Sequence, residues 1–184
     1  MSPILESIGS VKGFGWGSFS LPSSFESIAT VNGTGSSGTI TFSSIPSTYK
    51  HLQIRCISND GLGYTITMNF NNDSGTNYAW HVLKGTGSGV VADGIGSVNS
   101  MRIVQENGSI SNNFAVYIID ILDYASTSKA KTARVFNGRD QNGSGEVELR
   151  SGLWTSTDAI NRVDISIGGN FINRSTFALY GIKG

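Results

Sequence analysis

Hydrophobic and polar residues alternate along most of the chain from Phe25 onward. The clearest run covers residues 50–57, where Leu52, Ile54 and Cys56 share one face and polar side chains occupy the other. A period of two residues is typical of half-buried β-strands, because successive side chains point to opposite sides of the strand. Similar runs predict further strands over residues 27–31, 38–42, 64–70, 78–83, 97–104, 113–122, 132–138, 146–154, 161–167 and 176–182.

Turn-forming dipeptides separate these runs. Asn107-Gly108 and Asn142-Gly143 each lie between two alternating segments, which is the strongest local signal for a β-hairpin because both residue types tolerate positive φ. The longest helix-compatible stretch, residues 123–131, is short and polar, so we predict a loop there. Further turns are predicted at Asn32-Gly33, Asp60-Gly61, Asp93-Gly94 and Asn137-Gly138.

The strands and turns together predict the fold class. About ten short strands without a convincing helix indicate an all-β, antiparallel, jelly-roll-like β-sandwich, which we assign to residues 25–184. Residues 1–24 differ, because glycine and aromatic residues alternate there without continuing into a strand. We predict an extended N-terminal arm that docks Phe14, Trp16 and Phe19 on its own domain or on a partner.

One predicted strand, residues 114–122, is apolar on both of its faces. This pattern is typical of a central strand that is covered on each side, by the second sheet and by a loop or a neighbouring subunit. Asp120 lies within the run and needs a partner, for which Arg134 and Arg139 are the nearest candidates. The candidate residues for a subunit interface are Phe114, Val116, Tyr117, Ile118 and Ile119.

Composition and charge exclude several functional classes. Thirteen basic and thirteen acidic residues give a formal net charge of zero, whereas a protein that binds nucleic acid through phosphate contacts is usually basic. No stretch approaches the roughly 18 apolar residues of a membrane-spanning helix. The single cysteine, Cys56, excludes an internal disulfide and indicates a small apolar residue on its strand. We therefore expect neither nucleic-acid binding nor membrane insertion.

Residues that could support catalysis form no recognisable constellation. His51 and His81 lie beside no nucleophile motif, and we interpret both as surface or cross-strand residues. Glu146 and Glu148 share one face of a strand next to a turn, which we interpret as a solvated edge. Residues 33–38 match G-x-G-x-x-G, but a strand follows where dinucleotide binding requires a helix. We predict no catalytic residue and no cofactor.

The segment that begins at Asp140 bears some resemblance to a calcium-binding loop. Asp140, Asn142 and Ser144 supply oxygen atoms at positions 1, 3 and 5, and Gly145 stands at position 6. The acid expected at position 12 is Ser151, and the Asn-Gly pair alone explains a hairpin tip. We favour the hairpin and predict no metal site, with bound calcium as the alternative.

Three aromatic side chains near predicted loops leave carbohydrate binding open. Tyr78, Trp80 and Trp154 could present rings to a glycan, with several asparagines nearby to bind its hydroxyl groups. The alternative, that these rings fill the core or a subunit interface, is favoured by the usual energetic role of aromatic residues.

Three segments of the chain resemble a known family. They are FESIATVNGTGSSGTITFSSIPSTYKHLQIR at 25–55, DILDYASTSKAKTARVFNG at 120–138 and FALYGIKG at 177–184. They are similar to small β-rich virion structural proteins of tailed bacteriophages, notably those of aquatic hosts. These motifs are structural rather than catalytic, and the resemblance covers most of the chain.

The resemblance implies a location on the exterior of the virion. We expect a capsid decoration or cement protein that grips the head through its N-terminal arm and stabilises it. The alternatives are a tail-fibre or receptor-binding component that recognises host glycans, or a carbohydrate-binding module. The expected partners are other copies of the chain in a homotrimer, because closed oligomers hide sheet edges, and the major capsid protein or tail proteins.

Overall fold

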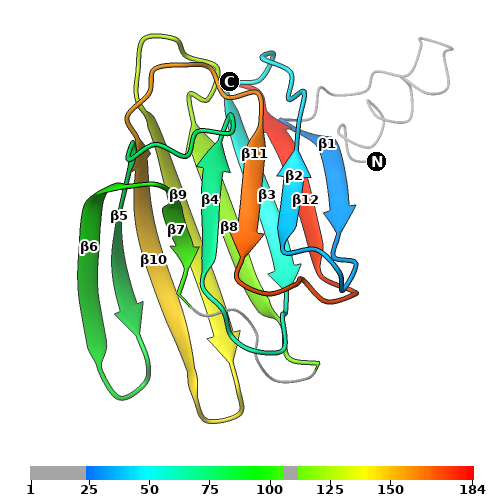
Figure 1. Cartoon of the computed structure of the whole chain (residues 1–184), viewed down its shortest axis with the longest axis vertical. Coiled ribbons are helices and arrows are strands. Elements are labelled where there is room, and N and C mark those ends of the chain that lie inside the picture. The colour runs from blue at the N-terminus through cyan, green and yellow to red at the C-terminus, as the bar shows by residue number, and fades with distance from the viewer. Residues whose placement is uncertain (1–23, 106–111) are drawn as a thin grey trace, which may run out of the picture.

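Strands account for all the regular secondary structure in the part of the chain that the structure describes. The computed structural model describes residues 24–105 and 112–184, and within these residues it contains twelve β-strands and no helix (Figure 1). The strands form two antiparallel sheets, so the prediction of an all-β sandwich is confirmed at this level. The predicted arm residues Phe14, Trp16 and Phe19 lie outside the described residues.

A large sheet and a small sheet make up the two layers. The large sheet contains, in spatial order, β1 (Phe25–Asn32), β12 (Thr176–Ile182), β3 (His51–Ser58), β8 (Ala115–Leu122), β9 (Lys131–Asp140), β10 (Gly145–Trp154), β5 (Tyr78–Gly85) and β6 (Val90–Val98). The small sheet contains β2 (Thr39–Phe42), β11 (Val163–Ile167), β4 (Ile66–Phe70) and β7 (Met101–Val104). In Figure 1 the small sheet lies in front of the large one, which extends beyond it on the side of β5 and β6.

The core fills the space between the two sheets. Alternate residues of each strand point into it, as the period of two requires; Ile54, Ile119 and Leu179 of the large sheet and Ile66 and Ile165 of the small sheet are fully buried there. Burying a large aliphatic side chain stabilises the fold by about 1.5–3 kcal/mol. Cys56 lies in this core, as its place on the alternating face predicted, and burial raises the pKa of its thiol well above the ordinary value.

The turn dipeptides had mixed outcomes. Asn142 and Gly143 both have positive φ and connect β9 to β10 in a tight hairpin closed by the Gln141 amide and the Ser144 carbonyl, so this prediction is confirmed. Asp93-Gly94 and Asn137-Gly138 lie inside β6 and β9, and their prediction as turns is wrong. Cross-strand pairing over their full length keeps these residues extended in spite of their turn propensity.

The sequence pattern missed one strand. β6 is an edge strand whose side chains are almost all exposed, so its apolar residues show no buried alternating face. The predicted strand over residues 97–104 contains instead the end of β6 and all of β7, which belong to different sheets. A two-residue connection at Asn99 and Ser100 carries the chain from one sheet to the other.

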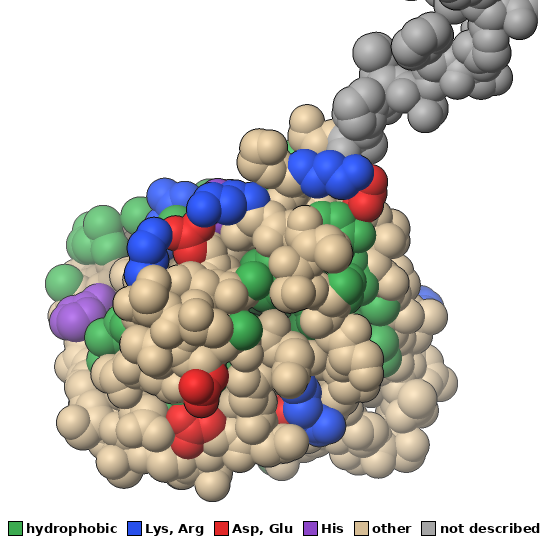
Figure 2. Space-filling model, turned by 90° about the horizontal axis from the view of Figure 1, so that it is seen from above, with side chains coloured by type: hydrophobic (Ala, Val, Ile, Leu, Met, Phe, Trp, Pro, Cys, Tyr) green, Lys and Arg blue, Asp and Glu red, His purple; other side chains and the backbone are tan. Residues whose placement is uncertain are grey.

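One end of the sandwich carries a small charge cluster. The loop between β8 and β9 is irregular, as predicted, and its Asp123 accepts ion pairs from Lys50 at 3.0 Å and Lys129 at 2.8 Å. The two ammonium groups, Lys129 first, lower the pKa of the Asp123 carboxyl to about 2. Figure 2 views this end and shows Lys and Arg side chains gathered beside carboxylates above the two layers.

Candidate interaction surface

The outer face of the large sheet, which points away from the small sheet, carries a continuous row of apolar side chains. Cross-strand register places Ile118 of β8 opposite Phe136 of β9, Phe136 opposite Leu149 of β10, and Leu149 opposite Leu83 of β5. Their exposed fractions run from 37% for Ile118 to 57% for Phe136. We call this surface the apolar outer face; its largest members are Ile57, Leu83, Val116, Ile118, Phe136, Val147, Leu149 and Leu153.

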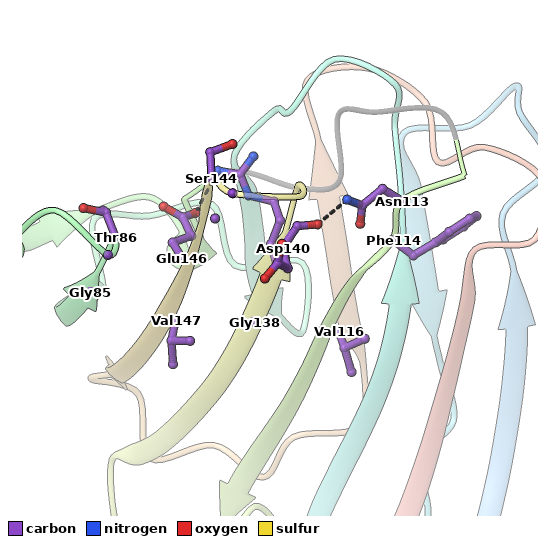
Figure 3. A pocket seen from close by; sticks show the side chains of 14 residues that line it. Gly85, Thr86, Asn113, Phe114, Val116, Gly138, Asp140, Ser144, Glu146 and Val147 are labelled. Atoms are coloured by element: carbon purple, nitrogen blue, oxygen red, sulfur yellow. Dashed lines mark hydrogen bonds and ion pairs between the residues drawn. The ribbon is translucent and has the colours of Figure 1, made fainter.

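A second row, nearer the hairpin loops, alternates branched side chains with glycine. Val116 and Val147 both face Gly138 across the strand pairs, and Val147 also faces Gly85. The two glycines contribute no side chain, so a hollow of about 640 Å³ opens between the valines and the loops of the β5–β6 and β9–β10 hairpins. Figure 3 shows Val147, Gly138 and Val116 side by side at this hollow, with Asn113 bonded to Asp140 at its rim.

Polar residues occupy a third row of the same face. Asp120 of β8 accepts a hydrogen bond from Gln53 Nε2 at 2.9 Å, and it lies opposite Arg134 in the strand register. Gln53, rather than either predicted arginine, is therefore the hydrogen-bond partner of Asp120. Arg139 instead lies 3.6 Å from Glu146.

The inner face of the same strands carries charge beneath the apolar outer face. Glu148 of β10 is fully buried and makes a bidentate ion pair with Arg150, both bonds measuring 2.9 Å. Asn137 of β9 donates a third hydrogen bond to Glu148 at 2.6 Å, and the backbone N–H of Gln105 donates a fourth at 3.3 Å. The interpretation of Glu146 and Glu148 as a solvated edge is therefore wrong, since both lie in the interior.

This buried pair is satisfied well enough to stay ionised. Burial would raise the pKa of Glu148, but the hydrogen bonds and positive charge of Arg150, with Asn137 and the Gln105 amide, outweigh it and lower the pKa. Two cations lie over the ring of Trp80, with the guanidinium carbons of Arg102 and Arg150 4.5 and 5.6 Å from its centre. Strand β10 thus turns its charges inward and its aliphatic residues outward.

The predicted interface strand divides between these two environments. Val116 and Ile118 lie on the apolar outer face with exposed fractions of 50% and 37%, and Phe114 is half-buried just before β8. Tyr117 and Ile119 point into the core and are buried, so neither is available to another subunit and their prediction is wrong. A loop or a neighbouring subunit was expected to cover the second side of this strand, and within the described residues Val116 and Ile118 remain exposed there, so no described loop supplies that cover.

The predicted glycan-facing residues lie in the core. Tyr78 and Trp154 are 1% exposed and Trp80 is 6% exposed, and Phe70 packs against both Tyr78 and Trp154. Their rings contact other core residues and offer no face to a sugar, so this prediction is wrong for all three. Trp154 instead donates its indole N–H to Asp73 Oδ2 at 2.7 Å.

The weak calcium candidate is a hairpin tip. The Asp140 carboxylate accepts the Asn142 backbone N–H at 2.8 Å, which is an ordinary Asx turn. Among the described residues, no group of three His, Cys, Asp or Glu side chains is arranged to hold a metal ion. His81 lies exposed on the outer face, and His51 Nδ1 accepts the backbone N–H of Asp123 at 3.0 Å.

The outer face of the small sheet has the opposite chemistry. Asp164 of β11 accepts two bonds from the Arg162 guanidinium, at 2.7 and 2.8 Å, and one from Thr41 Oγ1 at 2.6 Å. Asp164 and Arg162 border a polar depression of about 410 Å³. Its other lining residues are the carboxylate Asp73 and a set that carries hydroxyl or amide groups, namely Thr39, Thr67, Asn69, Asn72, Ser74, Asn99, Ser100 and Ser166.

The apolar outer face extends well beyond the residues that the sequence singled out. Leu83, Phe136 and Leu149 belong to predicted strands, but their exposure was not expected. The signal was present, because residues 146–150 place Glu, Glu and Arg on one side and Val and Leu on the other. Taking the apolar side as the inner one, the usual assumption, hides the outer face.

The chain matches no protein-family model, and none of the curated proteins matches it. In the described part of the chain, no helix has the length and apolar character to cross a membrane.

Proposed function

We propose that this chain is a structural component of a bacteriophage virion, acting as a decoration or cement protein on the exterior of the head. The observation that carries the proposal is the apolar outer face, which presents large aliphatic and aromatic side chains over five neighbouring strands. A soluble monomer rarely exposes a contiguous apolar patch of this kind, whereas a protein that adheres to neighbouring subunits needs one. The resemblance of three segments to phage virion proteins supplies the biological setting.

The strand order supports a jelly roll as the finer description of the fold. Without β5, β6, β9 and β10, the two sheets have the orders β1-β12-β3-β8 and β2-β11-β4-β7. Along the chain, the eight remaining strands then cross from one sheet to the other at every step except β4 to β7, which is the pattern of two nested Greek keys. On this description β5–β6 and β9–β10 are hairpins added to one edge, and they carry much of the apolar outer face.

The proposed partners are other copies of the chain and the major capsid protein. The N-terminal residues Phe14, Trp16 and Phe19 would attach the domain to the head. Replacing all three by serine in the full chain should leave thermal unfolding unchanged and abolish binding to particles that lack the protein. Binding at the wild-type level would overturn the role of the arm.

The test of the proposed function is the composition of purified particles. Quantitative mass spectrometry and a reconstruction of the phage that encodes the chain should place many copies on the head exterior. Absence of the chain from purified particles would overturn the proposal.

A second candidate function is glycan recognition by a tail-fibre or receptor-binding component, or by a carbohydrate-binding module. The polar depression on the small sheet favours it, because hydroxyl, amide and charged groups converge there in the pattern that binds sugar hydroxyls. A glycan array probed with the wild-type chain and with Asn69→Ala should show signals that the variant loses. An array without signals would exclude this candidate, and a few trimers at the tail would favour it over decoration.

A further inference from the structure

We propose that the apolar outer face of the large sheet is the interface between copies of this chain, with a second copy laying its own apolar outer face against it. This inference rests on the self-association included in the proposed function and assigns a surface to it. Because a face that packs against itself has two-fold symmetry, the expected oligomer is a dimer in place of the homotrimer expected from the sequence. The surface is assigned from the geometry of the isolated chain, so it is tested without reference to any particle.

The apolar area fits an interface between two folded subunits. Eight large side chains of this face are between 37% and 57% exposed. An aromatic side chain buries about 150–250 Å² and a large aliphatic one somewhat less, so eight half-exposed side chains present on the order of 700 Å². The largest apolar patch on an ordinary monomer is about 300–600 Å². A standard interface buries about 800 Å² on each partner, which matches the face together with its polar row.

The width of the face requires a broad occupant. Its residues come from β3, β8, β9, β10 and β5, and neighbouring strands lie about 4.8 Å apart, so the face is roughly 19 Å wide. A single extended segment, such as the N-terminal arm, covers a band about one strand wide. Another sheet covers the whole face, because packed sheets lie about 10 Å apart with their side chains interdigitated.

The shape of the apolar outer face is suited to packing against the same face of a second copy. Phe136 projects from β9, and Gly138, two residues further along the same side of that strand, leaves the hollow between Val116 and Val147. An interface with two-fold symmetry uses the same patch on both subunits, so projections and hollows must occur together on one surface. The apolar outer face contains both.

Charge does not oppose this contact. The chain has no net charge, so two copies have no long-range repulsion to overcome. The outer face carries one carboxylate, Asp120, which lies opposite the guanidinium of Arg134 in the β8–β9 register, and a second guanidinium, Arg55 of β3, opposite Ile118. Two copies related by a two-fold axis can therefore bring opposite charges together across the interface.

The first experiment measures the mass of the full chain by sedimentation velocity and light scattering across a range of concentrations. The wild-type chain should form a dimer, and a cyclic trimer would contradict the two-fold contact. Leu149→Glu places a charge in the middle of the face and should weaken association at least about thirtyfold, as expected for the loss of a central interface residue. Leu62→Glu is the matched control, because Leu62 is 70% exposed in a loop away from this face and should leave association unchanged.

The second experiment fills the hollow. A Cβ at Gly138 would meet no atom within 4 Å, and valine suits an extended strand, so Gly138→Val should fold at least as stably as the wild type. A second copy seated in the hollow would clash with the new side chain, and association should weaken at least tenfold. Gly89→Val is the control, since Gly89 is equally open but lies outside the hollow.

Several results would overturn the inference. They are a wild-type chain that stays monomeric at every concentration, an oligomer that survives both Leu149→Glu and Gly138→Val, and an oligomer that Trp16→Ser dissolves while Leu149→Glu does not. The last result would identify the arm as the occupant. If this inference fails, the composition of purified particles still tests whether the chain belongs to the virion. If the chain is absent from particles, the interface measured in solution still stands.

Discussion

The two outer faces of the sandwich differ in chemistry although both belong to antiparallel sheets of the same chain. On the outer face of the small sheet, polar side chains form hydrogen bonds with one another, and Asp164 accepts such bonds from Arg162 and Thr41. The outer face of the large sheet leaves Phe136 and Leu149 more than half exposed. A polar face is stable in contact with water, whereas an apolar one gains free energy when a neighbour covers it. The difference indicates which side of the molecule is built for contact.

The sharpest version of this contrast lies between two consecutive residues of β3. Cys56 is 1% exposed in the core, and Ile57 is 49% exposed on the apolar outer face. Because only the thiolate reacts and burial raises the pKa of Cys56, its thiol should react with a disulfide reagent only when the domain unfolds. The thiol introduced by Ile57→Cys should react with the same reagent at least about 10³-fold faster than Cys56. It is measured in a chain that also carries Cys56→Ser, which removes the buried thiol, and Leu149→Glu, which keeps a second copy off the face.

Absorbance at pH 8 follows both thiol reactions. Equal rates for the two positions would contradict the assignment of the two sides of β3. The same Ile57→Cys thiol without Leu149→Glu should react more slowly at high protein concentration if a second copy covers it.

Breaking the buried Glu148–Arg150 pair beneath the apolar outer face should cause the next largest effect, a loss of stability. Glu148→Gln leaves the buried Arg150 without its counter-charge, so the free energy of unfolding should fall by about 3–5 kcal/mol. Urea denaturation measures it, with Glu26→Gln as control, because Glu26 pairs with Lys183 at the surface and its loss should change stability little. A loss below about 1 kcal/mol would show that Glu148 does not hold the orientation of β10.

Substitution on the polar outer face of the small sheet should change the free energy of unfolding less. Asp164→Asn replaces a carboxylate that accepts three hydrogen bonds by an amide, and we expect a loss of about 1–3 kcal/mol in unfolding free energy. Phe136→Thr on the apolar outer face should change the stability of the monomer by less than about 0.5 kcal/mol, since the side chain is already exposed. A Phe136→Thr loss as large as that of Asp164→Asn would mean that the apolar face is part of the core.

The charge cluster at the end of the sandwich belongs to neither face and should give the smallest effect. The pKa of Asp123 is lowered to about 2, so its ion pairs stabilise the fold above about pH 4 and are lost as pH falls through 2. Asp123→Asn should therefore remove part of the acid sensitivity of the thermal midpoint in that window. The side-chain carboxyl resonance should titrate near pH 2, and a midpoint near 4 would contradict the ion pairs.

The interaction surface could be predicted from the sequence only in part. Val116 and Ile118 were identified because both faces of residues 114–122 are apolar, which no single-sided strand needs. Leu83, Phe136 and Leu149 escaped, since each lies in an ordinary alternating run whose other face was taken as polar surface. Tyr78, Trp80 and Trp154 looked close to loops in the sequence, but β5 and β10 pair along their full length and bring all three rings into the core.

The sequence by itself determined that the chain forms short strands, that Asn142-Gly143 is a hairpin turn, and that side chains fall into two alternating sets on each strand. Alternation depends only on backbone geometry, so it can be recognised locally. Which of the two sets faces inward was decided by the tertiary structure. In β10 the charged set is inside, because Arg150, Asn137 and the Gln105 amide satisfy Glu148 there. Arg150 lies on β10 itself, but Asn137 comes from β9 and the Gln105 amide from the residue after β7, so the full set of partners meets only when the sheets have assembled. Their meeting leaves the aliphatic set on the surface.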